Sequence, residues 1–321
     1  MAKKTTLYPL KFDPQLKGKV WGGEKLVSLL GKNAKGKIGE SWELSGVKGN
    51  VSVVANGSLK GENLTHLIEN FGATLLGNKV YANYGNEFPL LFKFIDAKED
   101  LSIQLHPNDA IAKERHNSFG KTEMWYVLQA DADAQLILGF NQEVDKETYL
   151  KSLSEGKITQ ILHSEKVTKG DTFLITPGTV HAIGAGILLA EIQQTSDITY
   201  RIYDWDRPDV DGSMRELHTD LALDIISFKD PKAKMAYSVS KNESTLLCKS
   251  AYFETYLLKL STTISKDISA LDSFIVYMCT EGEAVICGEK IQTGETILIP
   301  ASFDSVDINT TSATLLEVYV P

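Results

Sequence analysis

The chain has 321 residues, and 43% of them are hydrophobic, which is enough to fill one large core or two of ordinary size. Its formal net charge is -9, with acidic residues dispersed along the chain, and this disfavours non-specific binding to nucleic acid or anionic lipid. We therefore expect no nucleic-acid partner, and any anionic substrate must be held by a few local cations.

The cysteines and the start of the chain bear on the cellular compartment. Cys248, Cys279 and Cys287 have no metal-ligand spacing and cannot all pair with one another, so we expect reduced core residues. Residues 1–10 contain two lysines but no apolar stretch typical of an export signal, and no window reaches the length of a membrane span. We expect a cytoplasmic protein with no membrane contact, either a monomer or a small homo-oligomer.

In chain order, residues 21–23 and 39–43 lie in a glycine-rich region typical of short strands and tight turns. Helical spacing of apolar residues predicts a helix at 63–76, another is expected at 109–116, and a less regular one at 147–162. Elsewhere, short runs of Val, Ile, Tyr and Phe alternate with Gly, Pro, Asn and Asp. This pattern predicts a mainly β fold with helical insertions.

Two segments of the chain resemble each other. Residues 167–181 and 285–302 both read as strand, Gly-acid turn, strand and proline turn, which predicts a cupin-like β-barrel (jelly roll) segment present twice. The second copy lacks a histidine where the first has His181. Because residues 229–243 are polar and only strand patterns follow them, we predict two domains: residues 1–240, which bind a metal, and a smaller cupin-like β domain, residues 241–321, which does not.

Polar side chains alternate with apolar ones just before Pro107. Successive strand side chains point to opposite faces, so Ser102, Gln104 and His106 share one face. Taken alone, this pattern more often marks a half-buried strand whose polar face meets solvent.

The segment 121–128 carries large apolar residues on both faces, which predicts a strand buried on both sides. A buried carboxylate such as Glu123 is costly unless it is paired or bound to a cation. Lys121 could simply neutralise it, and a metal ion is the other possibility.

Further charged groups lie within predicted strands. His181 follows a Pro-Gly turn, although a lone histidine there is more often a hydrogen-bonded core residue than a ligand. Glu191 shares a strand face with Leu189 and Gln193, and Arg201 shares one with Thr199 and Tyr203. Together, Gln104, His106, Glu123 and His181 supply two nitrogens and two oxygens, a set that suits Zn²⁺.

These segments resemble the type I phosphomannose isomerases of the cupin superfamily. Residues 104–107 are similar to the family's Gln-x-His-Pro motif, residues 121–124 to its Lys-x-Glu-Met segment, and residues 177–181 to its Pro-Gly-x-x-His segment. The resemblance covers most of residues 10–220 in the same order. The chain lacks the large helical insertion of the long eukaryotic members, and residues 201–205 resemble the short bacterial branch.

The resemblance implies an intramolecular oxidoreductase that interconverts mannose 6-phosphate and fructose 6-phosphate by moving a proton between C1 and C2 through an enediolate. It also implies one Zn²⁺ per chain, held by Gln104, His106, Glu123 and His181. Expected catalytic residues are Arg201, Lys121, Glu191 and Asp197, and expected substrate-binding residues are Lys93 and Ser102. Either Lys121 or Glu191 could move the carbon-bound proton.

Two rival functions use the same fold. A metal-dependent cupin dioxygenase also places two histidines and a carboxylate around its metal, but the long interval before Glu123 and the neutral Gln104 are unusual for that class. A non-catalytic sugar-binding cupin would keep the barrel without turnover.

Overall fold

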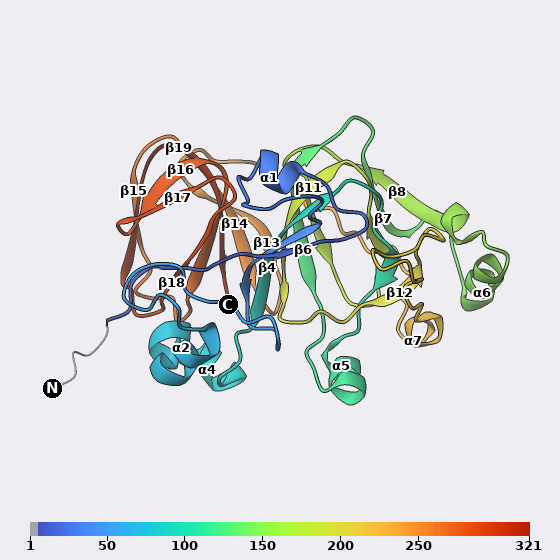
Figure 1. Cartoon of the computed structure of the whole chain (residues 1–321), viewed down its shortest axis with the longest axis horizontal. Coiled ribbons are helices and arrows are strands. Elements are labelled where there is room, and N and C mark those ends of the chain that lie inside the picture. Colours follow the sequence, from blue (N-terminus) through green and yellow to red (C-terminus); the bar gives the residue numbers. More distant parts are fainter. Residues whose placement is uncertain (1–5) are drawn as a thin grey trace.

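Antiparallel β-sheets form most of the structure, a computed structural model that describes residues 6–321 (Figure 1). The strands fall into three sheets of eight, five and six strands. The predicted mainly β fold with helical insertions is confirmed. Residues 1–5 lie outside the described residues, and they include part of the start of the chain for which no export signal is expected.

Two sheets build the first half of the molecule and share one apolar core. The six-stranded sheet has the order β2 (Gln15–Lys17), β3 (Glu40–Ser45), β4 (Leu90–Ala97), β11 (Ile187–Gln194), β6 (Glu123–Ala130) and β9 (Thr172–Ile175). The five-stranded sheet has the order β12 (Tyr200–Tyr203), β5 (Ile103–Leu105), β10 (His181–Ile183), β7 (Gln135–Phe140) and β8 (Leu162–Lys166).

The central strands of the six-stranded sheet are buried on both faces. Trp125 and Val127 on β6 face the core shared with the five-stranded sheet. Met124 and Tyr126, on the opposite face of the same strand, pack into a second core shared with the C-terminal strands. The predicted burial of residues 121–128 on both sides is confirmed, but the strand begins only at Glu123. This burial makes the charged groups among them informative.

The eight-stranded sheet is built mainly from the end of the chain. It contains β18 (Thr296–Ile299), β16 (Ile275–Ile286), β19 (Ser305–Tyr319), β14 (Glu254–Leu260), β13 (Ser244–Lys249), β15 (Ile264–Asp267) and β17 (Glu289–Gln292). One N-terminal strand, β1 (Leu10–Lys11), joins it by pairing with β18. In Figure 1 these orange and red strands stand beside the green strands of the first half.

The alternating side chains of the eight-stranded sheet serve two cores. Val276 and Met278 on β16 pack toward the first half of the molecule. Ile275 and Tyr277, from the same strand, line a separate core enclosed by the C-terminal strands. Residues 244–321 contain strands and no helix, as their sequence pattern predicts. The division at residue 240 stays a prediction, and the pairing of β1 with β18 shows that the N-terminal segment contributes to both halves.

The helices are short and lie outside the sheets: α1 (Lys25–Ser28), α2 (Leu64–Phe71), α3 (Ala73–Leu76), α4 (Asn78–Tyr84), α5 (Asp109–His116), α6 (Lys146–Ser154), the 3₁₀ helix η1 (Ile158–Ile161) and α7 (Thr219–Leu223). The helix predicted at 109–116 is confirmed. The helix expected at 63–76 is broken at Gly72, whose φ of 44° leaves the helical region.

The helix expected at 147–162 is also interrupted. It ends at Ser154, Gly156 follows with a φ of 67°, and Leu162 already begins strand β8. Gly22 and Gly23 form isolated bridges rather than a strand, and Trp21 lies in a turn. None of the helices in residues 6–321 has the length and apolar character needed to cross a membrane.

The three cysteines are free thiols. Cys248 and Cys279 are buried, as expected of core residues. Cys287 is only half-buried, so its expected place in the core is wrong: it has a φ of 46° and belongs to the tight turn between β16 and β17.

Candidate active site

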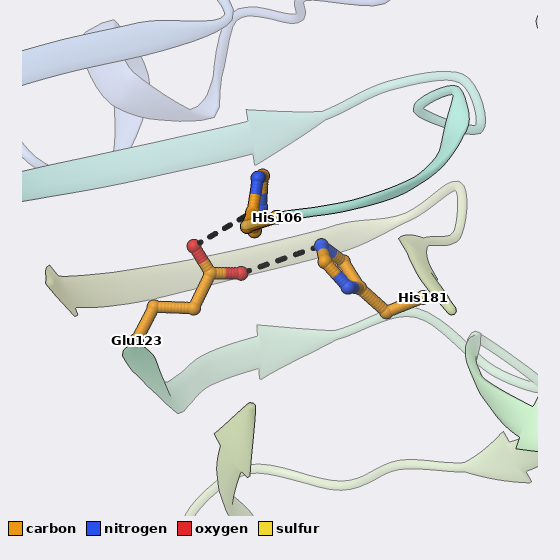
Figure 2. A group of neighbouring side chains, drawn as sticks. All are labelled: His106, Glu123 and His181. Atoms are coloured by element: carbon orange, nitrogen blue, oxygen red, sulfur yellow. Dashed lines mark ion pairs between the residues drawn. The ribbon is translucent and has the colours of Figure 1, made fainter. Parts of the chain in front are cut away.

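Two histidines and a glutamate meet between the two facing sheets of the first half. His106 follows β5 and His181 begins β10 in the five-stranded sheet, whereas Glu123 begins β6 in the six-stranded sheet. The Nε2 of His106 lies 3.6 Å from one carboxylate oxygen of Glu123, and the Nε2 of His181 lies 3.5 Å from the other. Figure 2 shows both imidazoles turned toward the carboxylate, one to each oxygen.

Hydrogen bonds fix the tautomer of both imidazoles. The Nδ1 of His106 lies 2.8 Å from the carbonyl oxygen of Ile198, and the Nδ1 of His181 lies 2.9 Å from that of Thr179. A carbonyl oxygen only accepts, so each Nδ1 carries the hydrogen and donates it. Each Nε2 is therefore left with a lone pair directed at the cluster, the arrangement found in metal-binding histidines.

Three polar atoms of this cluster are buried without a hydrogen bond: the Nε2 of His106 and both carboxylate oxygens of Glu123. Lys121 Nζ is 2.9 Å from one of these oxygens but does not have hydrogen-bond geometry toward it. Because unsatisfied buried polar groups are costly, their convergence indicates a missing partner. The three residues have ligand atoms within 4.8 Å of one another, and a divalent cation fits this donor set.

The electrostatic environment gives each group the protonation state that a metal ligand needs. Burial, reinforced by the neighbouring His106 charge, lowers the pKa of His181 to about 3. Burial and Lys121 also lower the pKa of His106. Burial opposes ionisation of Glu123, but Lys121 and the two histidines outweigh it and hold the pKa of this carboxyl well below its usual range. Neutral imidazoles and an ionised carboxylate result at neutral pH.

Gln104 stands beside this cluster. It is the direct partner of His181 across β5 and β10, and its Nε2 lies 3.5 Å from the Nε2 of His181. Its Oε1 accepts a hydrogen bond from Ser102 at 3.0 Å. To offer its carbonyl oxygen to a metal held by the histidines, the amide of Gln104 would have to turn over.

A cavity of about 480 Å³ opens from the cluster and holds most of the other predicted site residues. Lys93 and Glu191, partners across β4 and β11, form a buried ion pair of 2.8 Å in its wall. Trp125 donates a hydrogen bond of 3.0 Å to the other carboxylate oxygen of Glu191. Burial opposes the charge of Lys93, but Glu191 and Glu40 outweigh it and raise the pKa of Lys93 to about 12.

Arg201 lies in the same wall as the metal-binding candidates. It pairs with Gln104 across β12 and β5, and its Nε donates to the hydroxyl of Ser102 at 3.3 Å. Burial and the neighbouring Arg215 lower the pKa of Arg201. Asp197 also borders the cavity, but it is exposed at the rim.

All ten residues named from the sequence thus lie in the cluster or around this cavity, and their individual roles stay predictions. Thirteen further lining residues were not named from the sequence as site residues, among them Lys17, Lys19, Trp21, Glu40, Trp42, Asn50, Arg215 and His218. Of these eight, only Trp21, Glu40 and Trp42 gave a signal, as parts of short strands expected in the glycine-rich region. The others come from loops and edge strands, whose position depends on tertiary folding.

A second set of hydrogen bonds holds the cluster from outside. Asp109, at the start of α5, accepts from the backbone N–H of Gly120 at 2.8 Å and from Gln194 at 2.9 Å. The Oε1 of Gln194 in turn accepts from the N–H of Thr122 at 2.9 Å. The hydroxyl of Tyr252, between two C-terminal strands, donates to the other oxygen of Asp109 at 2.5 Å. The C-terminal half therefore reaches the segment that carries Lys121 and Glu123.

Known proteins are similar to this chain in sequence and in fold. The family model for the type I phosphomannose isomerase catalytic domain matches residues 9–130. A mannose-6-phosphate isomerase of Bacillus subtilis is 37% identical over 92% of this chain and 94% of its own. One from Streptococcus mutans is 34% identical over the same shares.

The solved structures agree. A crystal structure of the mannose 6-phosphate isomerase from Bacillus subtilis superposes with a TM-score of 0.87 at 30% identity, covering 97% of this chain and 99% of that one. That likeness runs through all three sheets, including the C-terminal half. The chain therefore belongs to the type I phosphomannose isomerase family.

Proposed function

We propose that this chain is a zinc-dependent mannose-6-phosphate isomerase that interconverts mannose 6-phosphate and fructose 6-phosphate through an enediolate. The observation that carries the proposal is the buried cluster of His106, Glu123 and His181, in which three ligand atoms have no hydrogen bond. Through His181 the cluster adjoins a cavity rich in cations. Family membership supports the choice of substrate, because the relatives that match over most of the chain are named for this reaction.

The donor set favours zinc among the divalent metals. His106 and His181 offer nitrogen and Glu123 offers oxygen, with Gln104 beside them as a fourth candidate. Zn²⁺ has no redox chemistry, so it is compatible with an oxidisable enediol. When bound, it would supply Lewis acidity to the sugar oxygens at C1 and C2.

The residues of the chain supply the remaining functions. Arg201 cannot act as a base, since a guanidinium does not lose its proton, so it stabilises negative charge on O1 or O2. Glu191 is held in place by Lys93 and Trp125, and it is a candidate to take the carbon-bound proton. Lys121 is the other titratable group at the site and can donate a hydrogen bond to a substrate oxygen.

The decisive experiment is an isomerase assay on the purified protein with mannose 6-phosphate, combined with elemental analysis. We expect about one zinc per chain, loss of turnover after treatment with a strong chelator, and recovery on adding Zn²⁺. Iron as the only bound metal, together with oxygen uptake during turnover, would identify a dioxygenase instead. Sugar binding without turnover in the zinc-loaded protein would identify a non-catalytic module.

A further inference from the structure

The cavity is positively charged within an acidic protein. Six of its lining residues are lysine or arginine and three are carboxylates, although the whole chain has a net charge of -9. Four of the six cations are ion-paired: Lys19 with Glu40, Lys93 with Glu191, Lys121 with Glu123, and Arg215 with Asp204. Within residues 6–321, Lys17 and Arg201 have no ion-pair partner, and the third lining carboxylate, Asp197, is exposed at the rim and pairs with neither of them.

Arg201 belongs to the end of the cavity where the metal-binding candidates lie. Its register partner is Gln104, whose amide nitrogen is 3.5 Å from the Nε2 of His181. Its own Nε donates to Ser102, one of the residues on the same strand face as Gln104. Arg201 therefore lies close to the metal-binding candidates.

Lys17 lies in a different part of the cavity wall, where it contacts none of the metal-binding candidates. Its ammonium is 5.0 Å from the centre of the Trp42 ring, and the ammonium of Lys93 is 5.1 Å from the same ring. From Lys93, the ion pair with Glu191 and the hydrogen bond from Trp125 lead on to His181, whose ring centre is 5.4 Å from that of Trp125. Several side chains thus separate Lys17 from the metal-binding candidates along the cavity wall.

The surroundings of Lys17 leave its charge and one donor available. It donates to the Oδ1 of Asn50 and, at 3.4 Å, to the Oε1 of Gln15, and both acceptors are neutral amides. An ammonium has three donors, so one remains for a ligand. Glu40, directly opposite on β3, is engaged instead with Lys19 at 3.3 Å and with Trp42 at 2.6 Å.

We propose that Lys17 binds the phosphate of the sugar phosphate, with the side-chain amide of Asn50 as its neighbour in the same subsite. The inference rests on the proposed function, because in mannose 6-phosphate the phosphate is at the opposite end of the carbon chain from C1 and C2. Lys93, which the sequence suggested for substrate binding, has its charge matched by Glu191 within the wall. Lys17 offers its charge to the ligand without breaking an ion pair.

The test compares Lys17→Met with Lys37→Met in the zinc-loaded protein. Methionine keeps an aliphatic stem on Trp42 while removing the charge. Lys37 is exposed and does not line the cavity. Its backbone is nevertheless close to the end of β2, since its carbonyl oxygen would lie 3.8 Å from the Cβ of a side chain at position 18. For Lys17→Met, KM for mannose 6-phosphate should rise roughly tenfold to a hundredfold with kcat nearly unchanged, because one charge-assisted contact to the substrate is lost. Lys37→Met should match the wild type.

Calorimetry with inorganic phosphate separates this inference from the proposed function, since binding needs no turnover. Weaker phosphate binding by Lys17→Met than by the wild type and Lys37→Met supports the subsite even if the wild type does not isomerise the sugar. Unchanged KM and unchanged phosphate affinity in a folded Lys17→Met protein would overturn the proposal. A rise in KM alone on substitution of Arg201, with no effect at Lys17, would assign the phosphate to Arg201.

Discussion

The two halves of the molecule contain similar segments with different interiors. In residues 167–181 a proline turn leads to His181, which points into a cluster of unpartnered polar atoms. In residues 285–302 the corresponding proline turn leads toward Phe303, which packs on an apolar core. The buried carboxylate of that second core, Glu317, is satisfied by the hydroxyl of Tyr277 at 2.7 Å and by Lys266 at 2.5 Å.

The difference separates structural polar groups from functional ones. Both halves bury a glutamate next to a lysine, so burial and pairing alone do not mark a site. In the C-terminal half Glu317 accepts hydrogen bonds from protein donors, whereas in the first half both oxygens of Glu123 accept none. An incomplete set of hydrogen bonds in a buried cluster therefore indicates where a ligand belongs.

The largest effect should come from Glu123→Ala. Removing this carboxylate leaves the buried Lys121 ammonium without its counter-charge and the metal without a ligand, so the variant should lose its metal, lose turnover, and become less stable by about 3–5 kcal/mol. Elemental analysis, the isomerase assay and denaturant unfolding measure the three effects. A variant that retains one zinc per chain would show that Glu123 is not a ligand.

Glu317→Ala is the matched control in the other half. It also removes a buried carboxylate from a lysine, and stability should fall by about 1–3 kcal/mol because Tyr277 and Lys266 lose their acceptor. Metal content and turnover of the folded variant should equal those of the wild type. Loss of metal from this variant would remove the distinction between the two glutamates.

Arg201→Ala should lower kcat by roughly 10²–10³ while leaving the zinc content intact, the scale expected when one donor that stabilises developing charge is removed. The reason is that Arg201 is unpaired and adjacent to Gln104. Steady-state kinetics with metal analysis provide the test. If KM alone rises, the arginine contacts the ground-state substrate instead.

Glu40 should make the first half sensitive to acid. Burial opposes its ionisation, but Lys93 and Lys19 outweigh it and bring its pKa to about 2, against 4.5 ordinarily. A lowered folded-state pKa stabilises the protein above pH 4.5, and this contribution is lost as the pH falls from 4.5 toward 2. The difference in unfolding free energy between wild type and Glu40→Gln should therefore shrink by about 3 kcal/mol over that window. A difference independent of pH would contradict the assignment.

The smallest effect tests the link between the halves. Tyr252→Phe removes the hydrogen bond from the C-terminal half to Asp109 and should lower metal affinity by roughly threefold to tenfold, measured by competition with a chelator. Tyr256→Phe, which removes a comparable bond to Glu254 at 2.7 Å in the same sheet, should leave affinity unchanged. Equal effects of the two variants would mean that the C-terminal half acts only through general stability.

The sequence by itself determined the fold class and the faces on which the site residues lie. Period-two alternation follows from the stereochemistry of a single strand, so it places Ser102 and Gln104 on one face without knowledge of any partner strand. In the same way, large apolar residues on both faces of residues 121–128 predict burial on both sides. The helix at 109–116 could likewise be predicted from its local sequence. Glycines at 72 and 156 interrupted the other two helices because a positive φ overrides apolar periodicity.

The tertiary structure alone decided which charges meet. Lys93 and Glu191 are 98 positions apart and become partners only because β4 and β11 are neighbours in one sheet. The same strand order brings the edge strands β2 and β12 to one cavity, where neither Lys17 nor Arg201 forms an ion pair within the described residues. No local pattern records these pairings, since electrostatic compensation depends on distances through space and not on separation along the chain.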